Sequence, residues 1–492
     1  MTDGSNVNHY HETKMTAICK ILWAFYCCLF AITCAASEET KKSETEVEVL
    51  APLPEHWQKM KIQEPIFGGS VHVVEVGTKH KPTIVLVHGL GYSGLRDWLD
   101  VIPHLEADYH VVALDLPGFG ESDPTSIQLA PVRYAQLLKW LIPQFSKEKV
   151  IIMGHSMGGA ISLRFASEYP HMLKRLIMVD TAGVLHRSVF VRHMTKMPDR
   201  YEWIAKYQQR FNFIDSAVGK VNRFLNRVSG TVLNQLDKLP DPTLVLMRNE
   251  FAQKYVYKDR PTLNAAIGLI NEDFSQAIHK FAIPTHIIWG EQDRVAPLRT
   301  GELLQFRLND AELHVIKDAG HVPMKDKTSE FLLALNQALQ RLPINTPVLK
   351  RPTTQLRDLV CQGQNDQVYS GHYANVYIRD CKYITLKDIS ADGILIERSE
   401  VTMQNINVAS DTVALDINSS FSTITNAILQ GQTGLQVQDS TVDMAGATLI
   451  TSQQSINVLK DSLLYLSVSQ VKQGGKNEFL HGMSQGDRFN IK

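Results

Sequence analysis

Short runs of β-branched and other apolar residues recur along the first two thirds of this chain, separated by segments long enough for helices. Near-continuous apolar strands of this kind are typical of a parallel sheet that helices cover on both faces. Ligands in such sheets bind beyond the carboxyl ends of the strands. We therefore expect functional residues in the loops that follow the runs. The runs are "TIVLV" (83–87), "HVVALD" (110–115), "VIIM" (150–153), "LIMVD" (176–180), "HIIWG" (286–290) and "LHVI" (313–316).

After "LPINTPVLKRPTTQLRD" (342–358) the composition shifts toward Ser, Thr, Gln and Asn, and a second periodicity follows. Apolar residues recur there at steps of 20 or 21, and serines keep the same phase at a turn. Short strands at such a period predict the stacked coils of a solenoid. The segment resembles a right-handed parallel β-helix of roughly five turns. The aligned sets are Ile394, Leu415, Leu435 and Ile456; Ile396, Ile417, Val437 and Val458; and Ser399, Ser420 and Ser440.

The length of 492 residues favours two domains, in agreement with these two sequence patterns. With 44% hydrophobic and 21% charged residues, the composition is that of a globular protein. A net charge of −1 gives no sign of a nucleic-acid partner.

The N-terminal segment 1–36 predicts export. An uncharged apolar run spans residues 21–33 and follows Lys14 and Lys20, which fits the core of a signal peptide better than a membrane span. The segment "LFAITCAAS" resembles a bacterial lipobox, with Cys34 as the lipidated residue. Cleavage after Ala35 or Ala36 and retention as a membrane anchor remain open. We expect the periplasm or outer membrane in a bacterium, and otherwise a secreted or membrane-anchored protein.

Cysteine usage agrees with export. Four of the six cysteines lie in or beside the apolar run, which leaves Cys361 and Cys381 in the body of the protein. In an oxidising compartment these two can form a disulfide, and two unpaired thiols are the alternative. The spacings do not indicate a metal site, and we expect neither a metal nor an organic cofactor.

The stretch "VIIMGHSMGGA" combines an apolar strand, a sharp turn at Ser156 and a helix start. Gly154 and Gly158 flank Ser156 because a strained, crowded turn tolerates no side chain at these positions. The turn presents the Ser156 hydroxyl above the sheet. It also places the Met157 amide at a helix N-terminus, where it can stabilise an oxyanion.

Together with "VLVHGLGYSG" (85–94) and "DLPGFGESD" (115–123), this stretch resembles the α/β-hydrolase family over about residues 60–342. The resemblance implies an α/β-hydrolase fold. The helical pattern of about residues 184–274, which interrupts the series of strands, predicts a cap over the strand ends. The resemblance also implies that the loop containing Gly89 and Gly91 supplies a second oxyanion donor, the Leu90 amide.

In this family the acid and base follow the serine in the chain. "IIWGEQDRVAP" supplies Asp293 and "DAGHVP" supplies His321. His321 would act as general base toward Ser156, and Asp293 would hold the imidazole tautomer. Asp180 and Glu291 are alternative acids.

A serine nucleophile forms an acyl-enzyme with esters, amides, thioesters or activated ketones. The sequence favours an exported hydrolase of carboxylic esters, of the esterase or lipase type, with a small-molecule or lipid ester as substrate. Hydrolysis of C–C bonds in ring-cleavage products is the alternative.

The predicted solenoid favours a non-catalytic module that binds a glycan or cell-envelope ligand, or that acts as a spacer. Its scattered aspartates, among them Asp416 and Asp443, are expected to be solvated turn residues. A rival interpretation makes the whole protein an adhesin with a vestigial hydrolase domain. The expected boundaries are 1–36 signal, 37–55 polar tether, 56–345 α/β-hydrolase domain, 346–373 linker, 374–475 solenoid and 476–492 tail.

Overall fold

The computed structural model describes residues 52–91, 93–186, 189, 260–279, 283–344, 356–485 and 488–491. The predicted signal segment with Cys34, the tether up to residue 51 and most of the predicted cap lie outside the described residues. Within the described part of the chain, no helix combines the length and the apolar character needed to cross a bilayer.

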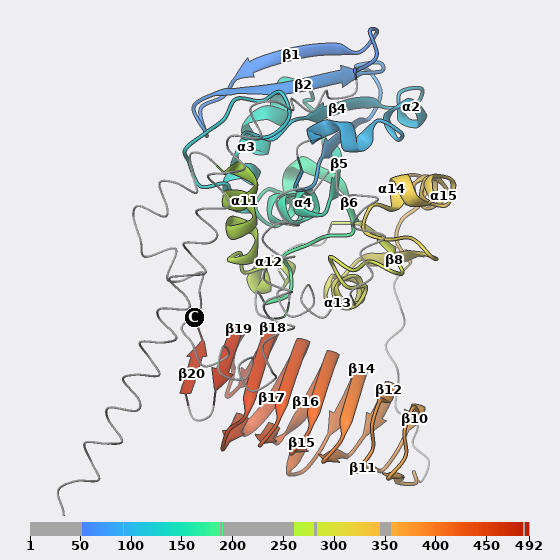
Figure 1. Ribbon diagram of the computed structural model, residues 1–492, viewed down its shortest axis with the longest axis vertical. Helices are drawn as coiled ribbons and strands as arrows, with labels where there is room; N and C mark the ends of the chain where they lie inside the picture. The colour runs from blue at the N-terminus through green and yellow to red at the C-terminus, as the bar shows by residue number, and fades with distance from the viewer. Residues whose placement is uncertain are drawn as a thin grey trace, which may run out of the picture. The chain divides into compact units, whose positions relative to one another are not determined.

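The first part of the chain forms an eight-stranded sheet with strand order β1-β2-β4-β3-β5-β6-β7-β8 (Figure 1). Strands β3 to β8 run parallel, whereas β1 and β2 are antiparallel to their neighbours. This is the α/β-hydrolase fold that the sequence predicts. The strands are β1 (Gln58–Gln63), β2 (Ser70–Val76), β3 (Thr83–Val87), β4 (His110–Leu114), β5 (Val150–His155), β6 (Leu173–Val179), β7 (Thr285–Gly290) and β8 (Ala311–Ile316).

Burial explains why the central strands lack the apolar–polar alternation of a half-exposed sheet. Every residue of β3, β4, β5 and β7 is buried, because helices and loops cover both faces. By contrast, no residue of the edge strand β1 is buried. The helices are α2 (Ile102–Leu105), α3 (Pro131–Leu141), α4 (Met157–Glu168), α11 (Pro261–Ile270), α12 (Ser275–His279), α13 (Arg299–Arg307), α14 (Pro323–Asp326) and α15 (Thr328–Gln340); the 3₁₀ turns are η1 (Gly94–Trp98), η2 (Ile142–Gln144) and η3 (Pro170–Met172).

The C-terminal part is all-β, with parallel strands in one curled sheet (Figure 1). Its two rows of parallel strands, β9-β11-β13-β15 and β10-β12-β14, meet in the long strand β16. The strands are β9 (Leu359–Gln362), β10 (Val368–His372), β11 (Asn375–Arg379), β12 (Ile384–Ala391), β13 (Gly393–Glu397), β14 (Glu400–Ala409), β15 (Val413–Asn418), β16 (Phe421–Gln438), β17 (Thr441–Leu459), β18 (Leu463–Gln473), β19 (Lys476–Gln485) and β20 (Arg488–Ile491).

The strand register confirms the repeat alignment made from the sequence. Ile394 pairs with Leu415, Leu415 with Leu435, and Leu435 with Ile456. All four side chains are buried, so each coil adds one layer to a continuous apolar core.

The aligned serines stack inside the solenoid. The backbone N–H of Ser399 donates to Ser420 Oγ at 3.0 Å, and the N–H of Ser420 donates to Ser440 Oγ at 2.9 Å. Each of these hydroxyls therefore satisfies a buried amide of the preceding coil. At the start of the solenoid, Cys361 and Cys381 form a disulfide.

The solenoid extends beyond the boundaries expected from composition. Strand β9 starts at Leu359, inside the segment expected to be a linker, because its buried Leu359 and Cys361 continue the apolar core. At the other end, β19 and β20 pair antiparallel where a tail was expected.

The prediction that Asp443 is a solvated turn residue is wrong. Asp443 lies within β17, and both of its carboxylate oxygens accept hydrogen bonds from Arg299 of α13, at 2.8 and 2.9 Å. Repeat phase alone gives no information about a partner that lies 144 residues earlier in the chain.

Candidate active site

Ser156 lies at the junction of β5 and α4 in a backbone conformation that L residues rarely adopt, with φ 53° and ψ −115°. The neighbouring glycines explain how the chain accommodates this turn. A Cβ on Gly154 would lie 2.2 Å from the Gly158 carbonyl oxygen, and one on Gly158 would lie 2.2 Å from the Val87 carbonyl oxygen. Strain held by crowded surroundings is typical of a functional position, and here it is the strand–turn–helix that the sequence predicts.

The structure brings Ser156, His321 and Asp293 together although they lie in three separate loops. The Ser156 hydroxyl donates to His321 Nε2 at 2.9 Å, and His321 Nδ1–H donates to Asp293 Oδ2 at 2.8 Å. Asp293 follows β7 and His321 follows β8, so both lie beyond the carboxyl ends of their strands. The arrangement has the geometry of a nucleophile, a base and an orienting acid.

Backbone amides fix the Asp293 carboxylate. Its Oδ1 accepts hydrogen bonds from the N–H groups of Val295 at 2.7 Å and Ala296 at 3.0 Å, which leaves Oδ2 for His321. Burial acts to raise the pKa of Asp293, but the charge and hydrogen bond of His321 and the other hydrogen bonds outweigh it, so that this pKa is lowered. Asp293 is therefore ionised when it faces the imidazole.

Asp180, the alternative acid, lies behind Asp293 rather than next to the base. It is fully buried at the end of β6, and its Oδ1 accepts the Gly290 N–H at 2.9 Å. Burial and the neighbouring Asp293 charge raise the pKa of Asp180 well above the usual range. Asp180 is thus a neutral carboxyl group that supports Asp293.

Glu291, the other alternative, contacts a different loop. Its Oε2 accepts the Asp318 N–H at 3.2 Å and its side chain is exposed, so it does not orient His321 in this structure.

His155 forms a hydrogen bond to the loop that contains His321. Its Nε2–H donates to the backbone oxygen of His321 at 2.8 Å, and the two rings lie 5.1 Å apart. Burial lowers the pKa of His155, although Asp97 partly opposes this effect. A neutral imidazole therefore holds the His321 backbone in place.

The two expected oxyanion donors belong to segments adjacent to Ser156. Met157 is the first residue of α4, so its amide belongs to the helix N-terminus. Gly89 packs against the elbow, where an added Cβ would lie 3.1 Å from Ser156 Cβ. This close approach places the Leu90 loop beside the serine. Gly91, in contrast, has no described atom within 4 Å of an added Cβ.

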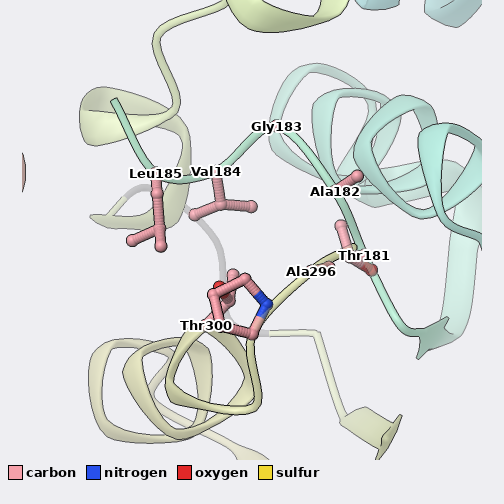
Figure 2. Close-up of a pocket in the computed structure, with 8 residues that line it drawn as sticks. Thr181, Ala182, Gly183, Val184, Leu185, Ala296 and Thr300 are labelled. Carbon is pink, nitrogen blue, oxygen red and sulfur yellow. The ribbon is translucent and has the colours of Figure 1, made fainter. Parts of the chain in front are cut away.

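A small pocket lies between the loop after β6 and the segment leading into α13 (Figure 2). One wall follows directly after Asp180, and the Ala182 N–H donates to the Ser156 carbonyl oxygen at 3.3 Å. None of the residues that line this pocket is charged. They are Thr181, Ala182, Gly183, Val184, Leu185, Ala296, Pro297 and Thr300.

Asp180, Asp293 and His321 bring one ligand-type atom each within 4.8 Å of one another, a spacing that could hold a metal ion. Both nitrogens of His321 are already engaged in the hydrogen bonds to Asp293 and Ser156. The cluster is therefore better described as part of a proton-transfer site.

Comparison with known proteins decides the family. The sequence model of one protein family, described as the alpha/beta hydrolase fold, matches residues 82–328, half of the chain. The chain belongs to the α/β-hydrolase family. As a member of this family it is a hydrolase, and the matched range contains Ser156, Asp293 and His321.

Several relatives share this hydrolase part. An uncharacterised protein of Mycobacterium tuberculosis is 28% identical over 302 residues, which cover 59% of this chain and 83% of the relative. A 2-hydroxy-6-oxononadienedioate/2-hydroxy-6-oxononatrienedioate hydrolase of a Pseudomonas species is 27% identical, over 55% of this chain and 92% of that protein. Among solved structures, an esterase of Exiguobacterium antarcticum aligns with a TM-score of 0.42 and 18% identity, covering 58% of this chain and all of that chain.

Proposed function

We propose that the protein is an exported serine hydrolase that cleaves carboxylic esters through an acyl-enzyme formed on Ser156. The observation that carries this proposal is the hydrogen-bonded line from Ser156 through His321 to Asp293, at 2.9 and 2.8 Å. His321 takes the serine proton as the hydroxyl attacks the ester carbonyl, and it returns the proton to the leaving alcohol. Water then repeats the sequence and releases the acid.

The Met157 and Leu90 amides are the proposed oxyanion donors. The former belongs to a helix N-terminus and the latter to the loop that packs on the elbow through Gly89. Donors fixed by the fold stabilise the tetrahedral oxyanion without reorganising during the reaction.

We propose that the small pocket forms one wall of the site for the acyl group of the substrate. Its lining is apolar apart from two threonines, and its loops continue directly from Asp180 and from the Asp293 turn. An uncharged wall favours a neutral acyl chain, because burying an unpaired carboxylate there would be unfavourable.

The second candidate is hydrolysis of a C–C bond, and the similarity to the Pseudomonas hydrolase favours it. The name of that relative describes a substrate with two carboxylate groups. Measuring turnover of a neutral p-nitrophenyl ester series alongside a ring-cleavage ketone separates the two activities. Turnover of the ketone alone would replace the ester proposal.

Export is supported by the Cys361–Cys381 disulfide, because disulfides persist in oxidising compartments.

We further propose that the solenoid targets the hydrolase to a glycan or to the cell envelope. Binding of the purified protein to peptidoglycan or to an acylated polysaccharide, measured by co-sedimentation, tests this role. Failure to bind either material would leave the solenoid as a spacer.

A further inference from the structure

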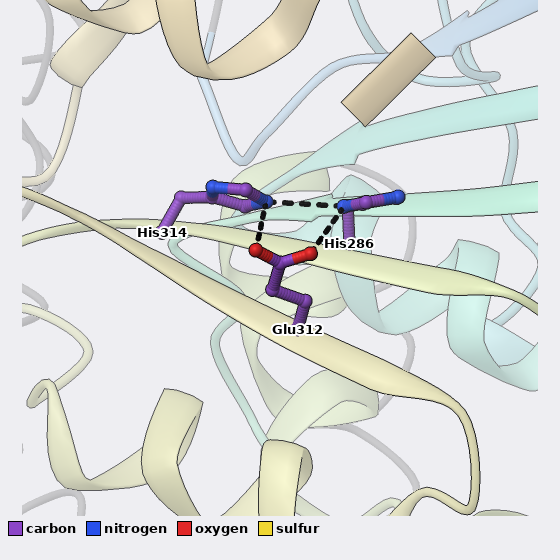
Figure 3. Close-up of side chains that lie close together, drawn as sticks. All are labelled: His286, Glu312 and His314. Atoms are coloured by element: carbon purple, nitrogen blue, oxygen red, sulfur yellow. Dashed lines mark hydrogen bonds and ion pairs between the residues drawn. The ribbon is translucent and has the colours of Figure 1, made fainter. Parts of the chain in front are cut away.

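A second cluster of polar side chains lies on strands β7 and β8, away from the serine. In the parallel register His286 pairs with Glu312, and Ile288 pairs with His314. Since side chains two residues apart on a strand share a face, His286, Glu312 and His314 project together from the same side of the sheet. Figure 3 shows the three side chains converging.

The converging atoms have the separations expected around one small cation. His286 Nδ1 lies 3.0 Å from His314 Nε2 and 3.9 Å from Glu312 Oε2. His314 Nε2 lies 3.9 Å from Glu312 Oε1. Zinc–nitrogen and zinc–oxygen bonds are about 2.0–2.2 Å long, so ligands on one zinc ion lie roughly 3–4 Å apart.

The tautomer of His286 directs a lone pair into the cluster. His286 Nε2–H donates to the Arg341 carbonyl oxygen at 3.2 Å, which leaves Nδ1 unprotonated and aimed at His314 and Glu312. A metal-ligating histidine commonly donates its other ring N–H to a backbone carbonyl in this way.

The carboxylate is also held from outside the cluster. Arg341 donates to both Glu312 oxygens at 2.6 Å, and the Ile344 N–H donates to Glu312 Oε2 at 3.0 Å. These bonds fix the direction of the Glu312 oxygens, as outer-shell partners of metal ligands do. The side chains of His286, Glu312 and His314 are 0%, 14% and 9% exposed, so the cluster is almost fully enclosed yet lies near the surface.

We propose that His286, Glu312 and His314 bind one zinc ion. Two imidazoles and a carboxylate, with water in the fourth position, form a ligand set that suits zinc. When zinc binds, His314 would lose the Nε2 proton that it otherwise donates to His286 Nδ1 and take up a solvent proton at Nδ1, so that it ligates as a neutral imidazole. His286 and Glu312 are the second residues of their strands, whereas Asp293 and His321 follow the opposite ends. The ion would therefore lie away from the serine and cross-link β7 and β8, whose far ends lead to the acid and the base.

The test uses the full chain, stripped with a chelator and titrated with zinc chloride while zinc binding and the melting temperature are followed. We expect one zinc ion at this site and a rise in melting temperature. His314→Gln should weaken zinc binding by at least about a hundredfold and remove the rise at zinc concentrations that just saturate the wild type. The control His171→Gln replaces an exposed histidine and should behave as wild type.

If zinc does not bind, or if His314→Gln binds and is stabilised like wild type, the proposal is overturned. If His314→Gln fails to fold, X-ray absorption on zinc-loaded wild type and His171→Gln decides instead. Two imidazole ligands with oxygen completing the shell are expected. A zinc ion surrounded only by oxygen would contradict the site, and then a hydrogen-bonded histidine pair accounts for the cluster.

Discussion

Asp180 and Asp293 form a carboxyl–carboxylate pair at the ends of β6 and β7, in which the buried Asp180 keeps its proton and Asp293 is ionised. The Gly290 N–H donates a hydrogen bond to Asp180, and Asp293 accepts one from His321 Nδ1. The sequence allows either residue as the acid that orients the base. In the structure Asp293 is the anion that orients His321, and Asp180 is a neutral carboxyl group behind it.

Asp180→Asn should remove the pH dependence that this buried proton imposes on stability. An unfolded aspartate titrates near pH 4, whereas folded Asp180 stays protonated to a much higher pH. Folding therefore takes up a proton above pH 4, and this contribution to wild-type stability declines as the pH rises toward the folded pKa. Asparagine does not titrate, so the stability of Asp180→Asn relative to wild type should rise as the pH increases above about 4 in urea denaturation curves.

The exposed Asp100→Asn controls for the loss of one negative charge from the protein. A difference between wild type and Asp180→Asn that stays constant with pH would contradict a protonated Asp180.

Asp293→Asn should reduce kcat by about 10⁴-fold with little change in KM, because the amide no longer selects the His321 tautomer. Steady-state kinetics on an ester substrate measure this effect. Near wild-type turnover would instead assign the orienting role to Asp180.

Gly158→Ala should destabilise the fold by about 1–3 kcal/mol and abolish most activity. The new Cβ would collide with the carbonyl oxygens of Val87 and His88. Gly91→Ala, in the open part of the oxyanion loop, is the matched control and should fold normally. Thermal denaturation of the two variants compares them directly. Equal melting temperatures would show that the elbow is less crowded than the structure indicates.

Ser420→Ala tests the serine stack inside the solenoid. The Ser420 hydroxyl accepts the Ser399 N–H and donates to the Asn418 carbonyl oxygen at 2.6 Å. Removing it leaves a buried amide without an acceptor, at a cost of about 1–3 kcal/mol. Chemical denaturation should show this loss for Ser420→Ala and none for the exposed Ser452→Ala. Equal stability of the two variants would rule out a structural role for the stack.

The sequence predicts the features of this protein that depend on local pattern. The strand–turn–helix at Ser156 can be predicted because the spacing of the glycines indicates where the backbone is crowded. The register of Ile394 with Leu415 can be predicted because every coil buries an apolar residue at the same position. Motif order within the family places Asp293 and His321 after their strands before any distance is known.

Features that depend on tertiary proximity could not be predicted in the same way. The partnership of Asp180 with Asp293 and that of Asp443 with Arg299 each join residues more than a hundred positions apart. The histidines of the β7–β8 cluster lie in runs recognisable as strands, but only the strand register places them on one face. The first strand of the solenoid was missed because Leu359 and Cys361 follow a segment with linker-like composition.

The most direct test of the account is hydrolysis of p-nitrophenyl esters, from acetyl to palmitoyl, by the wild-type protein and by Ser156→Ala. The proposed mechanism predicts a chain-length optimum in wild type and a loss of at least about 10⁴-fold in kcat in the variant, with an unchanged melting temperature. Hydrolysis by Ser156→Ala at the wild-type rate would contradict a serine nucleophile at this position.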